Sequence, residues 1–138
     1  MNAPTGRLEG YKSWEGGTDP FEDHAGPFYS KTHADGSHTA AFESKPHHCN
    51  GGGFLHGGMM MTFADYALFA IAGDVLDGPG VTVSFNSEFI AAVGAGKFVE
   101  ARGEVVRNTR SLIFIRGEVF CDDQVLLPFS GIIKRVGK

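Results

Sequence analysis

The stretch that decides the fold runs from Asn50 to Ala72 and reads NGGGFLHGGMMMTFADYALFAIA. Between Met59 and Ala72 only Thr62 and Asp65 carry clearly polar side chains. A glycine-free apolar run of this length predicts a helix that is buried on all sides. A carboxylate within such a helix must be desolvated, paired or used, because an unpaired buried charge is strongly unfavourable. Asp65 is therefore the first candidate for a functional residue.

Strands are expected on both sides of this helix, which should end near Gly73. Alternating apolar and polar residues predict two strands before it, at 28–33 and 37–43, joined by a hairpin turn at Asp35-Gly36. Four more are predicted after it, at 80–90, 98–107, 111–121 and 125–136. In the first of these four, the alternation puts Val81, Val83 and Phe85 on one face and Thr82, Ser84 and Asn86 on the other.

This order predicts an α+β domain, in which an antiparallel sheet of five to six strands covers one long helix. Residues 1–26 are expected to form an irregular arm with one helical turn near 21–24, and residues 27–138 to form the domain. A single sheet covers only one side of a helix that is apolar all round. The other side is expected to meet a partner subunit.

Bulk properties exclude several classes of protein. The chain has 138 residues, enough for one domain, and a net charge of -4, which argues against a nucleic-acid binder. Its two cysteines, Cys49 and Cys121, and the absence of a secretory signal pattern fit a reducing cytoplasm. The run from Met59 to Ala72 is shorter than the roughly 20 residues that a membrane-spanning helix needs.

The start of the helix offers hydrogen-bond donors to a ligand. Gly57 and Gly58 leave their backbone N–H groups accessible, and the first N–H groups of a helix lack internal partners, so they suit a carbonyl that gains negative charge. Alternatively, these glycines only relieve crowding. Asp65 lies 65 − 57 = 8 residues further on, about 12 Å along the axis, which is too far for direct contact. A two-fold dimer with antiparallel helices would bring Asp65 of one chain near Gly57 of the other.

Three polar residues of this segment each have two possible roles. Asp65 could be structural, bonded to the backbone or to Thr62; His56 could donate to a carbonyl or orient the loop; Asn50 could bind a carbonyl or cap the glycine-rich turn. The pattern His47-His48-Cys49 lacks a second ligand pair for a metal site. The run Met59–Met61 is most simply core packing.

The spaced pattern of Asn50, His56-Gly57-Gly58 and Asp65 resembles the signature of hotdog-fold acyl-CoA thioesterases of the phenylacetate-degradation (PaaI-like) type, over roughly residues 40–138. The resemblance implies a long helix wrapped by the sheet, subunits joined edge to edge into dimers that pair into tetramers, and active sites at the dimer interface. It implies that Asp65 activates water or attacks directly, and that the Gly57 amide and Asn50 of the facing chain bind the thioester carbonyl. His56 would then support the loop. Gly58 would belong to the binding site, and Thr82 would hold the water where relatives carry a small hydroxyl residue. No cofactor is implied.

Two other functions remain open: a hydratase or dehydratase on the same fold, and a non-catalytic acyl-CoA binding protein. Hydratases and dehydratases of this fold lack the His-Gly-Gly start of the helix. The spacing between their histidine and their acid also differs from the spacing in this chain, which is 65 − 56 = 9. For the coenzyme A nucleotide, Arg107 and Arg110 beside a hairpin turn are the leading candidates. Lys97, Lys134 and Arg135 come next, while Phe63, Phe69 and Phe89 either line the acyl pocket or pack in the core.

Overall fold

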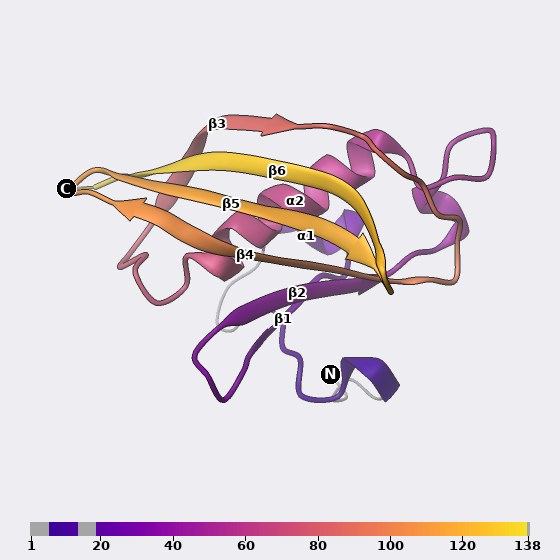
Figure 1. Ribbon diagram of the computed structural model, residues 1–138, viewed down its shortest axis with the longest axis horizontal. Coiled ribbons are helices and arrows are strands. Elements are labelled where there is room, and N and C mark those ends of the chain that lie inside the picture. Colours follow the sequence, from indigo (N-terminus) through magenta and orange to yellow (C-terminus); the bar gives the residue numbers. More distant parts are fainter. Residues whose placement is uncertain (1–5, 14–18, 138) are drawn as a thin grey trace.

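The computed structural model describes residues 6–13 and 19–137 and has one antiparallel sheet wrapped around one long helix (Figure 1). Its six strands lie in the order β1-β2-β4-β5-β6-β3. The α+β arrangement and the hairpin connections predicted from the sequence are confirmed. The strands are β1 (Tyr29–Thr32), β2 (His38–Glu43), β3 (Gly80–Ser87), β4 (Phe98–Asn108), β5 (Leu112–Cys121) and β6 (Gln124–Arg135).

The long helix α2 (Gly57–Ile71) packs across the concave side of the sheet. Its buried residues, among them Phe63 and Leu68, form one continuous core with the inward side chains of the strands. The approach is close at Gly131 on β6, where a Cβ would lie 2.5 Å from Leu68 Cδ1. A glycine at this point therefore lets the helix reach the sheet. No helix in the described ranges is long and apolar enough to cross a membrane.

Strand β3 departs from the predicted alternation because it carries a β-bulge. Its pairing with β6 shifts register between Thr82 and Ser84. The extra residue reverses the faces beyond it, so Thr82 and Phe85 both point toward α2, whereas the sequence pattern put them on opposite faces. Val83, at the bulge, is exposed. The predicted face assignment along this strand is thus wrong beyond Thr82.

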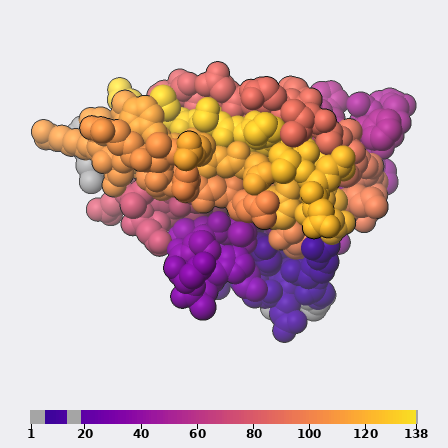
Figure 2. All heavy atoms as spheres, viewed as in Figure 1, coloured from indigo at the N-terminus to yellow at the C-terminus, as the bar shows by residue number. Residues whose placement is uncertain are grey.

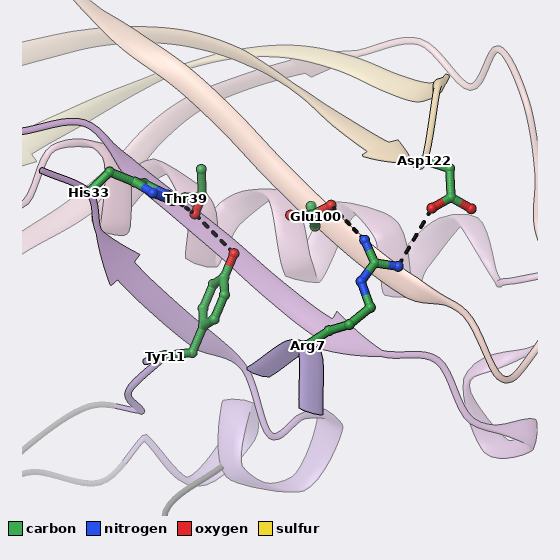
Figure 3. Close-up of polar contacts among 6 residues, drawn as sticks. All are labelled: Arg7, Tyr11, His33, Thr39, Glu100 and Asp122. Atoms are coloured by element: carbon green, nitrogen blue, oxygen red, sulfur yellow. Dashed lines mark hydrogen bonds and ion pairs between the residues drawn. The ribbon is translucent and has the colours of Figure 1, made fainter. Parts of the chain in front are cut away.

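The N-terminal arm wraps the β1 side of the sheet. A short 3-10 helix, η1 (Gly6–Leu8), lies on the outer face, where Arg7 forms ion pairs with Glu100 at 3.6 Å and Asp122 at 3.5 Å (Figure 3). The Tyr11 hydroxyl shares a 3.1 Å hydrogen bond with Thr39 in the same view. The arm then crosses to the helix side as α1 (Pro20–Ala25), which contacts α2 and confirms the helical turn predicted near residues 21–24.

The two edges of the sheet differ. At the β1 edge, Lys12 exchanges two backbone hydrogen bonds with Ser30, at 2.8 and 2.7 Å, so the arm occupies this edge at Ser30. At the other edge, β3 pairs with β6 on one side, and no strand of the described chain pairs with its second side. Figure 2 shows the face away from α2, where β4, β5 and β6 form a broad surface and the β1–β2 hairpin projects beside it. An open edge strand is a template for a further strand.

Candidate active site

Asp65 is half-buried on α2, beside the edge strand β3. The Thr82 hydroxyl on β3 donates a 2.6 Å hydrogen bond to Asp65 Oδ1. This bond fixes the orientation of the carboxylate and leaves Oδ2 for another partner. Thr62, the alternative partner considered from the sequence, instead donates to the Gly58 carbonyl at 2.9 Å. The structure therefore brings Thr82 and Asp65 into direct contact.

His56 caps the start of α2. Its Nδ1 accepts a 2.9 Å hydrogen bond from the Gly58 amide, which fixes the tautomer of a neutral ring with the proton on Nε2. Among the hydrogen bonds of the described residues, none is donated by the Gly57 amide. A Cβ at Gly57 would come within 2.9 Å of the Phe89 ring, so the close approach of this ring requires glycine there. One amide is thus engaged by the cap and one remains for a ligand.

Asn50 organises the glycine-rich loop through its oxygen. Its Oδ1 accepts from the amides of Gly52 and Phe54, at 2.9 and 3.2 Å. This is the capping arrangement that the sequence left as one of two possibilities. The Asn50 side chain is exposed. Because its oxygen faces the loop, its NH₂ group points away from the loop, where it can donate a hydrogen bond. Asn50 can therefore cap the glycine-rich turn with its oxygen and also bind a carbonyl with its NH₂ group.

A pocket of about 470 Å³ opens beside Asp65. Met61, Thr62 and Phe85 line it from the α2 and β3 side. Its remaining wall is α1, with Asp19, Phe21 and Glu22. The sequence did not predict this wall, although Asp19-Pro20 is a helix-start signal, because nothing in the arm showed where its helix would dock.

A second pocket, of about 420 Å³, lies at the start of the helix. His56, Gly58 and Met59 line it together with residues of α1. The methionine run is therefore divided, with Met60 buried in the core and Met59 and Met61 each lining a pocket, so core packing accounts for only part of it.

The aromatic candidates have different surroundings. Phe63 is fully buried in a ring cluster with Phe28 and Phe42. Phe69 is half-buried against the core and lines neither pocket. Phe85, which the sequence did not single out, is the strand aromatic beside Asp65. The bulge in β3 explains why the alternation pattern did not reveal it.

The basic candidates lie away from both pockets of a single chain. Arg107 and Arg110 are exposed beside the β4–β5 turn, at the end of the sheet where the C-terminus lies (Figure 1). Arg135 has a structural role, because its guanidinium donates hydrogen bonds to the backbone carbonyls of Thr109 and Val75. Lys97 and Lys134 are exposed.

His48, from the sequence His47-His48-Cys49, has a structural role. Its Nε2 donates to the Ala25 carbonyl at 2.7 Å, and its Nδ1 accepts from the Lys45 amide at 3.0 Å. Burial lowers the pKa of His48 below its usual range, which suits a neutral ring with one donor and one acceptor. The end of α1 is thereby fastened to the segment that precedes the glycine-rich loop.

Comparisons with known proteins agree with this geometry. The family model of the thioesterase superfamily matches residues 52–128, which include most of the glycine-rich loop, α2, and the strands β3, β4 and β5. This chain belongs to the thioesterase superfamily. It is a thioester hydrolase of the PaaI-like hotdog type, and the fold expected from the resemblance is confirmed.

Individual relatives support the same assignment. A provisionally described esterase of Pseudomonas aeruginosa is 28% identical over 134 residues, 96% of each chain. A mutant form of the phenylacetic acid degradation protein PaaI from Thermus thermophilus is 30% identical, with a TM-score of 0.74 over 86% of this chain and 100% of that chain. The BH2602 protein from Bacillus halodurans, solved with CoA, is 21% identical and shares the fold, with a TM-score of 0.71 over 79% of this chain and 74% of that chain.

Proposed function

We propose that this thioester hydrolase acts on acyl- or aryl-CoA and releases a free acid and coenzyme A. The observation that carries the proposal is the Asp65 carboxylate, oriented by Thr82 in an open pocket on an otherwise apolar helix. The CoA bound in the Bacillus halodurans relative supports the substrate class.

In the proposed reaction, Asp65 acts as general base or as nucleophile. As a base, it takes a proton from water, and the resulting hydroxide attacks the thioester carbonyl. The Gly57 amide and the Asn50 NH₂ group donate hydrogen bonds to the oxyanion, which collapses and expels the coenzyme A thiolate. As a nucleophile, the carboxylate attacks the thioester carbonyl and expels the coenzyme A thiolate, and water then cleaves the resulting acyl anhydride at the Asp65 carbonyl. A single turnover in heavy-oxygen water separates the two routes, because direct water attack labels the product acid, whereas cleavage at the Asp65 carbonyl labels the Asp65 carboxylate.

The complete site is proposed to form between two chains. Asp65 and Gly57 are separated along one helix by about 12 Å, so one chain cannot place both on one carbonyl. The open β3 edge carries Thr82, so pairing of two such edges would place both copies of Asp65 at the interface. Two subunits joined in this way form the homodimer, and two dimers the homotetramer, that the resemblance implies.

The function is tested by measuring two activities of the wild-type protein on the same day and preparation. Release of the coenzyme A thiol is expected from a panel of acyl- and aryl-CoA thioesters, whereas hydration of crotonyl-CoA is not. Hydration without thiol release would instead assign the hydratase function. Tight binding of acyl-CoA with neither reaction would assign a binding protein.

Arg107 and Arg110 are proposed to bind the coenzyme A phosphates. Replacing both with Ala is expected to raise KM for acyl-CoA about tenfold with little change in kcat, because uniform binding is lost at exposed charges. Steady-state kinetics with acyl-CoA and with an N-acetylcysteamine thioester, which lacks the nucleotide, provide the measurement. The short thioester should be unaffected.

The matched control removes two other arginines from the same β4–β5 hairpin. Arg102 and Arg116 are also exposed, but they are paired with Glu118 and Glu104. Their double Ala variant should keep the wild-type KM. An unchanged KM in the Arg107/Arg110 variant would reject the assignment and favour Lys97 or Lys134, since Arg135 is held by backbone carbonyls.

A further inference from the structure

The helix α1 forms a fixed wall beside the proposed active site. At its start, the Asp19 side chain accepts a 3.0 Å hydrogen bond from the Glu22 amide. At its end, the Ala25 carbonyl accepts the 2.7 Å hydrogen bond from the buried His48. The first bond caps the helix itself, and the second ties its end to the rest of the domain, so α1 is held where it packs against α2.

Phe21 stands out on this wall. Its side chain is 62% exposed and faces the Asp65 pocket, where it can contact a ligand. Met61, across from it on α2, is 39% exposed. Both side chains line the Asp65 pocket, so exposed apolar surface lies beside the carboxylate.

Phe21 also separates the two pockets. It and Thr62 are the residues that line both the Asp65 pocket and the pocket at the helix start. The Thr62 hydroxyl is already bonded to the Gly58 carbonyl, and its side chain is small. The size of the partition is therefore set by the Phe21 ring.

We propose that Phe21 is a specificity-determining residue that limits the length of the acyl group. The inference rests on the proposed acyl-CoA thioesterase function and extends it to a residue of the N-terminal arm. The acyl group lies in the Asp65 pocket against Phe21, Met61 and Phe85, and the Phe21 ring stops it from extending into the pocket lined by His56 and Gly58. Removing the ring joins the two pockets into one groove.

The test compares Phe21→Ala, Phe21→Trp and the wild type on butyryl-, octanoyl-, lauroyl- and benzoyl-CoA. In Phe21→Ala the ratio of kcat/KM for lauroyl-CoA to that for butyryl-CoA should rise about tenfold, the scale of a few methylenes gained in an apolar pocket. In Phe21→Trp the ratio should fall. Asp23→Ala, an exposed residue of the same helix that lines neither pocket, should keep the wild-type ratio. The proposal is overturned if this ratio is unchanged in Phe21→Ala, which includes the case in which kcat/KM changes by the same factor for every substrate.

Two further measurements separate this inference from the function on which it rests. Binding of S-butyl-CoA and S-dodecyl-CoA, thioethers without a cleavable carbonyl, reports the same preference by calorimetry even if no thioester is hydrolysed. Light scattering of Phe21→Ala reports the oligomeric state. If the variant dissociates into smaller species while its ratio of dissociation constants stays that of the wild type, Phe21 is a subunit contact and the proposed role is wrong.

Discussion

Replacing Asp65 with Asn is expected to lower thioester turnover at least about a hundredfold, the scale of losing a positioned base. The substitution preserves size and still lets the Thr82 hydroxyl donate to a side-chain oxygen, so the fold should be retained. The loss is therefore chemical, because an amide neither accepts a proton from water nor attacks a thioester. Turnover is measured by coenzyme A release, and the fold by circular dichroism and thermal unfolding.

The matched control for this variant is Asp77→Asn. Asp77 is an exposed carboxylate in the turn before β3, and the substitution makes the same change of charge outside both pockets. It should leave turnover at the wild-type level. Near-wild-type hydrolysis by Asp65→Asn itself would refute the role of the carboxylate, whatever the control shows.

Mixing two inactive variants is expected to restore activity. Asn50→Asp keeps the oxygen that holds the glycine-rich turn but loses the NH₂ donor, and Asp65→Asn loses the base. If each site takes Asp65 from one chain and Asn50 from the other, a mixed dimer has one intact site. Random pairing then recovers about one quarter of the wild-type activity, because half of the dimers are mixed and each has one good site of two.

The mixture is made by co-expressing the two variants with different affinity tags. Purification through both tags removes assemblies that contain one variant alone. The recovered activity should then rise to about one half of the wild-type value if the protein is a dimer, and to about two sevenths if dimers pair into tetramers. Light scattering on the wild type should show a dimer or tetramer. As a control, Asp65→Asn is combined with the double variant Asn50→Asp/Asp65→Asn, in which every site lacks the carboxylate and no activity should return. A mixture of the single variants that stays inactive would mean that each chain builds its own site.

Much of the fold followed from local patterns in the sequence. The helix was recognisable from its unbroken apolar run, and its bounds of Gly57–Ile71 fall next to the glycines that mark its two ends. The strand pairs 98–107 with 111–121, and 111–121 with 125–136, were predictable because their short connections leave the antiparallel neighbour as the only partner within reach. At the site, the carboxylate stood out for the same local reason, as a charge in an apolar helix.

Features that depend on contacts distant in sequence were not predictable. The bulge at Thr82 and Ser84 is set by pairing with β6, and it places Phe85 beside Asp65 against the period-two pattern. The docking of α1 depends on a hydrogen bond between Ala25 and His48, residues that no local pattern connects. The arm therefore looked irregular in sequence, although it supplies one wall of the pocket.

The unequal edges of the sheet have a consequence for how far assembly can proceed. A chain with two bare edge strands could add copies at both ends and polymerise into a ribbon, the route that leads to fibrils. Here the Lys12–Ser30 bridge occupies part of the β1 edge. In the dimer proposed above, the two β3 edges pair with each other, so the two edges that remain are the bridged β1 edges. We expect the arm to hinder a further strand there, so that assembly by strand pairing stops at two chains.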